Sequence, residues 1–312
     1  MFRSGFSCAV ERWLEASGRS GRKSLFFCPA LGAARTKAGS GVATMIALIV
    51  VLIRAPAAYA DNLTLDGPME QGGLIHGHAE PGATVALDGR HLRVAPDGAF
   101  IFGFPRDAPA QASLDVAGRN GGRVHRILTV APQHYRTQRI NGLPRDEVSP
   151  NPETLKRILH DIAAIRAAHR VDSDTRDFET PLRWPVIGPV SGVFGSQRIL
   201  NGEPRAPHAG IDIVAPSGTP VVAPAGGVVT LAEPDLVLDG GTVTIDHGYG
   251  LSTLYIHLSK IAVRKGEHVA QGQTIGAVGA TGRATGANLH WGVYWYEMAL
   301  DPMLAAGPMP MR

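Results

Sequence analysis

From Thr242 to His257 the sequence reads TVTIDHGYGLSTLYIH, in which two apolar runs flank a glycine-containing turn. The runs are rich in Val, Ile, Thr and Leu, and β-branched residues favour strands over helices. Short runs of this kind, bounded by turn residues such as Asp246-His247-Gly248, are typical of β-strands. The stretch therefore predicts two strands, and His257 closes the second of them.

The same pattern of short apolar runs separated by Gly and Pro begins at about Trp184 and continues after His257. Further candidate strands cover Gly210 to Val214, Val228 to Ala232 and Leu289 to Trp295. No helix of normal length is visible, and a stretch of about 120 residues is a common size for one core. We therefore expect residues 184–302 to form one compact β domain, followed by a tail at 303–312.

Three side chains with metal-ligand chemistry lie in or beside these candidate strands. His208 and Asp212 are four residues apart, and an even spacing puts both on one face of a strand, with Gly210 between them leaving room for an ion. His290 follows on a later strand. Two histidines and one aspartate suit Zn²⁺ and leave a fourth position for water, whose pKa falls to about 7.

Two further polar residues accompany this set. Asn288 lies two residues before His290, on the same face of the strand. His257, next to a metal-activated water, can act as a general base or stabilise an oxyanion. Each motif alone is common by chance, so the hypothesis of a metallohydrolase rests on their joint order along the chain.

The motifs His208-x-x-x-Asp212, Tyr255 to Leu258 and Thr285 to Trp291 occur in that order. Four flanking segments agree with them: Ser191 to Gly195, Ala215 to Val221, Asp246 to Gly248 and Val269 to Gly279. Together they resemble the lysostaphin-type (LytM-like) zinc peptidases over about residues 184–302. The resemblance implies a compact antiparallel β domain with one zinc in a groove. It also implies hydrolysis of peptide bonds in bacterial peptidoglycan.

By position, the resemblance implies that His208, Asp212 and His290 are the zinc ligands and that His257 is catalytic. Asn288 departs from the family, which has a catalytic histidine there. An amide can donate and accept hydrogen bonds but cannot exchange a proton near neutral pH. Asn288 therefore predicts a lower rate, or loss of activity with zinc retained.

Two functions follow from this set of residues. The intact ligand set favours an exported zinc metalloendopeptidase acting on stems or cross-links of the cell wall. The alternative is a zinc-retaining domain of weak or no activity, which binds the wall or activates another cell-wall hydrolase. A wall-binding module with incidental metal gives no reason for His257 to accompany the ligands.

Residues 61–131 predict a separate small β module. Candidate strands cover Thr84 to Leu87, His91 to Val94 and Ala99 to Phe102, separated by turn dipeptides such as Asp88-Gly89. Turns every 8–12 residues indicate an immunoglobulin-like (Ig-like) β-sandwich. The pair His76 and His78 has no further ligand nearby, which favours solvated residues over a metal site.

Residues 132–183 predict a linker with one helix, at about 152–169. Pro152 suits a first helical turn. Five apolar residues then recur at helical spacing and predict a packing face: Leu155, Ile158, Leu159, Ile162 and Ile165. His160 and His169 are expected on the surface of this helix.

Residues 1–60 predict a leader and a signal peptide. The run from Gly41 to Ile53 has 13 apolar or small residues, whereas a membrane span needs about 20. Arg35 and Lys37 precede it and Ala58-Tyr59-Ala60 follows, the order of a secretory signal with its cleavage site. We expect a protein exported to the periplasm or cell envelope, with membrane attachment only if this segment stays uncleaved.

The distribution of charge argues against nucleic acid as a partner. The sequence pI is about 9.0 and the net charge is +3, but residues 1–60 alone carry eight basic and two acidic residues. The remainder is therefore net negative, without the basic character of a nucleic-acid-binding protein. Cys8 and Cys28 are the only cysteines, so residues 61–312 contain no disulfide or thiolate nucleophile.

Overall fold

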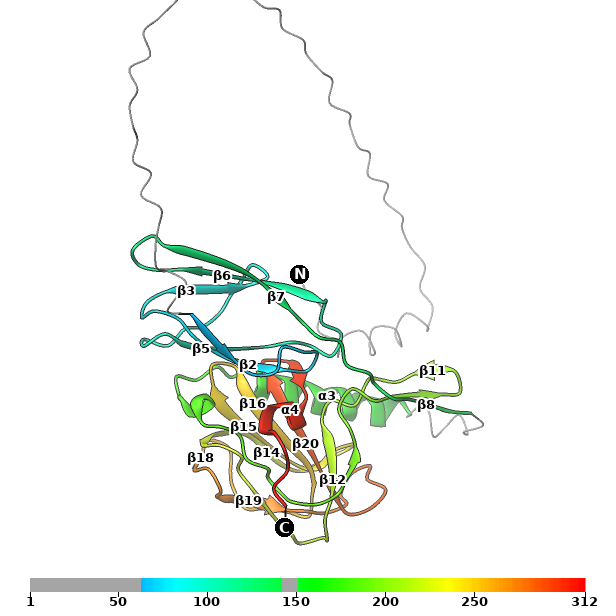
Figure 1. Ribbon diagram of the computed structural model, residues 1–312. Coiled ribbons are helices and arrows are strands. Elements are labelled where there is room, and N and C mark those ends of the chain that lie inside the picture. The colour runs from blue at the N-terminus through cyan, green and yellow to red at the C-terminus, as the bar shows by residue number, and fades with distance from the viewer. Residues whose placement is uncertain (1–62, 142–150, 312) are drawn as a thin grey trace, which may run out of the picture.

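The structure is a computed structural model that describes residues 63–141 and 151–311 (Figure 1). The expected signal segment, both cysteines and part of the expected linker lie outside these residues. Within the described residues, no helix combines the length and the apolar character needed to span a bilayer.

An eight-stranded antiparallel sheet forms the C-terminal part. The strands run in the order β18-β14-β15-β16-β20-β12-β9, with β21 paired to β20. Their bounds are β9 Val190–Gly192, β12 Ile211–Val214, β14 Gly227–Leu236, β15 Gly240–Gly248, β16 Leu251–Leu258, β18 His268–Val269, β20 Asn288–Trp295 and β21 Met298–Leu300. The expected compact antiparallel β domain is confirmed, and the opening stretch is the β15–β16 pair.

A smaller sheet and a short helix complete this part of the molecule. The sheet has the order β13-β19-β17, with bounds Pro220–Val222, Thr274–Ala277 and Lys260–Ile261. Val221 and Ile275 are fully buried in the same core as Trp291 of β20. The short helix α4 spans Pro302–Ala306, and a 3₁₀ turn, η2, spans Asp177–Glu179.

The N-terminal module contains two sheets. One has the order β1-β2-β5 and the other β4-β3-β6-β7. The bounds are β1 Thr64–Asp66, β2 Leu74–His78, β3 Thr84–Leu87, β4 Arg90–His91, β5 Ala99–Gly103, β6 Gln111–Ala117 and β7 Arg123–Thr129. The protein is mainly β, as expected, but the strand expected to continue to Val94 already ends at His91. The Ig-like assignment stays a prediction.

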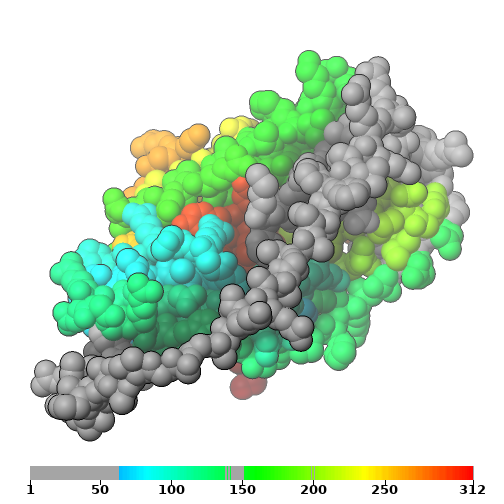
Figure 2. All heavy atoms as spheres, turned by 90° about the horizontal axis from the view of Figure 1, so that it is seen from above, coloured from blue at the N-terminus to red at the C-terminus, as the bar shows by residue number. Residues whose placement is uncertain are grey.

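The module packs directly on the C-terminal part. Viewed from above in Figure 2, its cyan and teal atoms lie against green and red parts of the chain. Arg93 forms an ion pair with Asp172, and a Cβ on Gly103 would lie 2.6 Å from Leu300. Buried apolar residues of both parts belong to one continuous core.

Helix α3 (Pro152–His169) has the expected bounds. Asn151 caps it by accepting a hydrogen bond from the Thr154 N–H. Its last two turns, with Ile165 and Ala168, pack against β14, whereas Leu159 is 40% exposed.

One histidine of α3 differs from the expectation. His160 is exposed, but the expectation that His169 lies on the surface is wrong. His169 is buried, its ring stacks on Tyr294, and its Nδ1 is 2.7 Å from Ser252 Oγ. The last turn of α3 approaches the large sheet, so its final side chain is covered by β16 and β20.

The first part of the expected linker contains a strand that was not predicted. Strand β8 (Thr137–Ile140) pairs in parallel with β10 (Gln197–Leu200). Strand β10 also pairs with β11 (Glu203–Pro204) to form a hairpin just before His208. The segment that follows the N-terminal module therefore pairs with the segment that leads to His208.

Because two histidines are buried, we expect the stability of the folded protein to decrease at acidic pH. Burial lowers the pKa of His169 to about 3 and that of His247 to about 4. Unfolded histidines titrate near 6.5, so between about pH 6.5 and 4 the unfolded chain binds more protons and stability falls as pH falls. We expect the free energy of unfolding to drop by about 1.4 kcal/mol per pH unit for each histidine in that window.

Urea unfolding of the metal-free protein in steps from about pH 7 to 4 measures this slope. A His169→Gln variant should show a shallower slope than the wild type. A free energy of unfolding that stays constant over the window would contradict the prediction.

Candidate metal centre

Strand pairing places two of the expected ligands opposite each other. β12 and β20 are antiparallel, and in their register Asp212 faces His290. Ile256 of β16 pairs with His290 on the other side, which brings the end of β16 to the same region. The strand pairing therefore brings residues of three separate motifs into one region.

His208 reaches the site by a different route from the one expected. β12 begins at Ile211, so His208 lies in the irregular segment before the strand, and the argument from even spacing on one strand does not apply to it. Its backbone N–H donates to Ser196 O at 2.8 Å, and its carbonyl accepts from the Gly195 N–H at 2.9 Å. A turn, and not the strand itself, fixes this residue.

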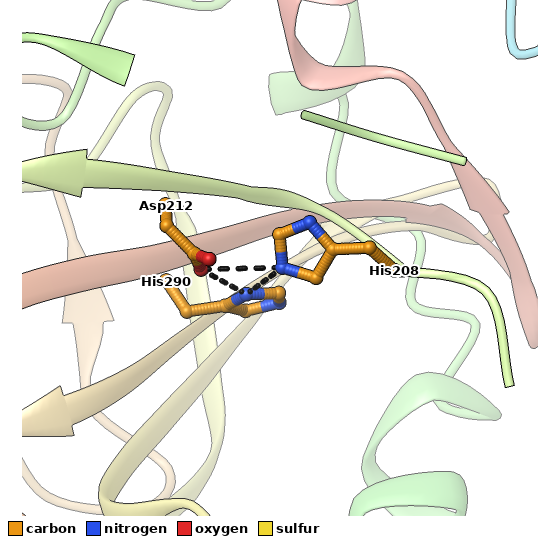
Figure 3. A group of neighbouring side chains, drawn as sticks. All are labelled: His208, Asp212 and His290. Carbon is orange, nitrogen blue, oxygen red and sulfur yellow. Dashed lines mark hydrogen bonds and ion pairs between the residues drawn. The ribbon is translucent and has the colours of Figure 1, made fainter. Parts of the chain in front are cut away.

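The three side chains converge on one point (Figure 3). His208 Nε2 lies 3.2 Å from Asp212 Oδ1 and 2.9 Å from His290 Nδ1, and the last two atoms are 2.9 Å apart. Among the described residues, this is the one group of at least three His, Cys, Asp or Glu side chains arranged to hold a metal ion.

The hydrogen bond on the far side of His208 decides which nitrogen faces the site. His208 Nδ1 lies 3.1 Å from the carbonyl oxygen of Val193, which can only accept. Nδ1 therefore carries the proton, and Nε2 presents its lone pair to Asp212 and His290. A backbone carbonyl that orients a metal-binding histidine is a common supporting contact.

The electrostatics of the trio favour a bound cation. Burial alone would raise the pKa of Asp212, but its close contacts with the imidazoles of His208 and His290 outweigh burial and hold that pKa well below its usual range. Burial lowers the pKa of His290. Near neutral pH the site therefore presents a carboxylate at Asp212 and a neutral imidazole at His290, the forms that bind metals.

The spacing of the three atoms fits a small tetrahedral ion. Zinc bonds to imidazole nitrogen and carboxylate oxygen of about 2.0–2.2 Å separate tetrahedral ligand atoms by about 3.3–3.5 Å. The observed separations of 2.9–3.2 Å are slightly shorter, and small side-chain movements would accommodate the difference. Two imidazoles and one carboxylate also leave a position open for water or substrate.

Two glycines make the close packing of the site possible. A Cβ on Gly210 would lie 2.8 Å from His290 Nε2, so the space expected for an ion is taken by the ring of His290. A Cβ on Gly192 would lie 2.2 Å from Asp212 Oδ2. The importance of Gly192 was not predicted, because only the β9–β12 pairing brings it opposite Asp212.

His257 lies near the end of β16, as expected. Its φ of 65° is in the left-handed region, which costs free energy for a residue with a side chain. Its backbone N–H donates to Asp239 O, and its Nδ1 donates to Thr281 O at 2.8 Å. This fixed tautomer leaves Nε2 as the nitrogen that can accept a proton.

Asn288 begins β20 and occupies the position where a histidine was expected from the resemblance. Its Nδ2 donates to Gly286 O at 2.8 Å. Its Oδ1 is buried and has no hydrogen-bond partner among the described residues. An amide side chain can accept a hydrogen bond through this oxygen but cannot exchange a proton near neutral pH.

The remaining histidines have other roles. His247 is buried and lies within hydrogen-bond distance of Gly226 O and Thr253 Oγ1, which indicates a structural role. His268 is exposed. His76 and His78 belong to no group of three metal-binding side chains within the described residues.

Comparison with known proteins gives a family for this arrangement. Residues 206–302 match peptidase family M23. Peptidoglycan DD-endopeptidase ShyA of Vibrio cholerae is 40% identical over 141 residues, which are 44% of this chain and 32% of that protein. DD-carboxypeptidase/endopeptidase Mpg of Neisseria meningitidis is 43% identical over 103 residues, which are 33% of this chain and 24% of that protein. The matches thus span a third or less of these relatives.

A solved structure extends the similarity beyond the site. A Pseudomonas aeruginosa protein assigned to peptidase M23 is 32% identical to this chain. The alignment covers 78% of this chain and 96% of that one, with a TM-score of 0.61. Because this relative matches over nearly its whole length, and the family match includes His208, Asp212 and His290, the chain belongs to peptidase family M23.

Proposed function

We propose that the protein is an exported zinc metalloendopeptidase that hydrolyses peptide bonds of bacterial peptidoglycan. The observation that carries the proposal is the convergence of His208 Nε2, Asp212 Oδ1 and His290 Nδ1 within 3.2 Å of one another. Similarity to proteins named as peptidoglycan endopeptidases supports the substrate class. Location in the periplasm or cell envelope follows from the substrate and the signal-like segment.

Each residue of the site has a separate role in the proposed reaction. His208, Asp212 and His290 would hold one zinc ion, which supplies Lewis-acid polarisation of a carbonyl and acidifies water. His257 accepts a proton at Nε2 or stabilises the oxyanion by donating from it. Asn288 accepts a hydrogen bond at Oδ1 and moves no proton. Proton transfer therefore depends on His257 alone among these residues.

The alternative function has one specific observation in its favour. The buried, unpartnered Oδ1 of Asn288 stands in place of a group that could carry a proton. A domain that keeps its metal but reacts slowly would then bind the wall or activate another wall hydrolase. In either case the N-terminal module, which we take to be Ig-like, would position residues 184–302 on the wall or on such a partner.

Digestion of purified peptidoglycan by the purified full chain tests the proposed function. We expect soluble muropeptides with new amino groups at bonds between two amino acids of the stem or cross-link, which cleavage of the glycan or of the sugar–peptide bond does not generate. A chelator should stop the release, and stoichiometric zinc should restore it. Zinc-loaded protein that leaves the peptides intact would favour the alternative function.

Replacement of Asn288 tests how much the asparagine at this position lowers kcat. Asn288→His introduces a second group that exchanges protons, and positioned acid–base groups contribute about 10²–10⁴-fold. We expect kcat to rise by about 10²-fold, with unchanged zinc content. Asn288→Gln keeps an amide and serves as the control, with no expected gain. An Asn288→His variant no faster than wild type would show that the amide is sufficient.

A further inference from the structure

The turn Val193–Ser196 holds His208 by three contacts. Val193 O accepts from His208 Nδ1, Ser196 O accepts from the His208 N–H, and the Gly195 N–H donates to His208 O. These contacts fix both the backbone of His208 and the tautomer of its ring. The position of the turn therefore determines where His208 Nε2 points.

Two residues from outside the large sheet hold this turn. Arg106, in the N-terminal module, donates from Nε to Gly195 O at 2.7 Å. Its guanidinium lies 4.3 Å from the centroid of the Tyr135 ring. The Tyr135 ring also packs directly against Gly195. A Cβ on Gly195 would lie 2.1 Å from Tyr135 Cδ1. Tyr135 also meets Phe194 edge-on, with ring centroids 6.1 Å apart.

We propose that Arg106 and Tyr135 are positioning residues of the metal centre, so that their local contacts with the Val193–Ser196 turn set the affinity for the metal. The chain of contacts runs from Arg106 through Gly195 to His208 without a gap. Gly195 has a φ of 73° and Val193 is 40% exposed, and the contacts of Arg106 and Tyr135 add to the anchoring of the turn by the buried Phe194. Supporting contacts of this kind contribute about 10–100-fold to metal affinity.

The structure offers a matched control in Arg90. This residue also bridges the module and the C-terminal part, with its guanidinium 4.8 Å from the Trp295 ring and 4.7 Å from the Tyr296 ring. Trp295 lies at the opposite end of β20 from His290. Loss of Arg90 therefore weakens docking of the module without touching the Val193–Ser196 turn.

Zinc affinity of the full chain, measured by competition with a chromophoric chelator, tests the proposal. We expect Arg106→Ala to weaken zinc binding by about 10-fold, and Arg90→Ala to change it by less than about 2-fold. The absorption spectrum of the Co²⁺-loaded protein should change in Arg106→Ala only, because the spectrum reports the geometry of the ligands. Arg106→Lys keeps a donor and a positive charge near Tyr135 and should restore most of the affinity.

Wild-type affinity and spectrum in Arg106→Ala would overturn the proposal, as would an equal loss in Arg90→Ala. If Arg106→Ala does not fold, Tyr135→Leu takes its place, with a loss of affinity expected and retained affinity against the proposal. The inference rests on the metal site in the proposed function, not on its substrate. Zinc binding that depends on Arg106 in a protein that cleaves no peptidoglycan would overturn the peptidase function and support the positioning role.

Discussion

His290→Ala is expected to lose both the metal ion and the peptidase activity. His290 is the most buried of the three candidate ligands, and its Nδ1 contacts both other ligand atoms. Its removal leaves only His208 and Asp212, too few for a stable zinc site. Because the metal supplies several kcal/mol of charge stabilisation, we expect the rate of cleavage to fall by at least about 10³-fold.

Metal content by mass spectrometry and release of muropeptides measure this loss in the same preparation. His160→Ala is the matched control, because His160 lies on the exposed face of α3 and is 85% exposed. It should keep both the metal and the activity. Stoichiometric zinc and undiminished cleavage in His290→Ala would remove this residue from the metal centre.

His257→Asn is expected to separate proton transfer from metal binding. Asparagine tolerates positive φ better than most residues, so this variant removes the proton-accepting ring without adding backbone strain at φ 65°. We expect kcat to fall by about 10²–10⁴-fold, with zinc content and melting temperature unchanged. The effect should be at the large end of that range, because Asn288 cannot take over the proton.

Steady-state kinetics on a soluble stem-peptide substrate give kcat and KM separately. A loss confined to kcat indicates that His257 acts in the chemical step. Two results would contradict this role: unchanged kcat, or loss of zinc together with activity. The second result would indicate that His257 supports the metal site instead.

Local patterns predicted helix α3 and the longest strands of the large sheet. The apolar spacing and the Pro152 signal gave the bounds of α3, and the runs rich in β-branched residues gave the centres of β14, β15, β16 and β20. These elements are encoded by residues close together in the sequence, so a single sequence is sufficient to find them.

Features that depend on distant contacts were missed. β8 has only four residues and pairs with β10 about sixty residues later, so no local signal marks it. His169 was expected on the surface because the apolar stripe of α3 does not include it, yet the last turn meets the large sheet. In both cases tertiary packing decides the outcome.

The sequence predicted which residues form the candidate site but not the contacts that hold them in place. The residue types at His208, Asp212 and His290 indicated a metal site, and the structure brings these three side chains together. The support from Val193, Gly192 and Arg106 could not be predicted, because backbone carbonyls, glycines and a distant arginine carry no motif. Their contribution appears only when the turn before β10 and the β9–β12 pairing are seen.

The most direct measurement of the central claim is diffraction at the zinc absorption edge from crystals of the protein as purified. The account predicts one anomalous peak, with His208 Nε2, Asp212 Oδ1 and His290 Nδ1 at about 2.0–2.2 Å from it. It also predicts that His257 and Asn288 lie outside this ligand set. A peak elsewhere, or full coordination that includes His257 in place of one of the three, would contradict the account.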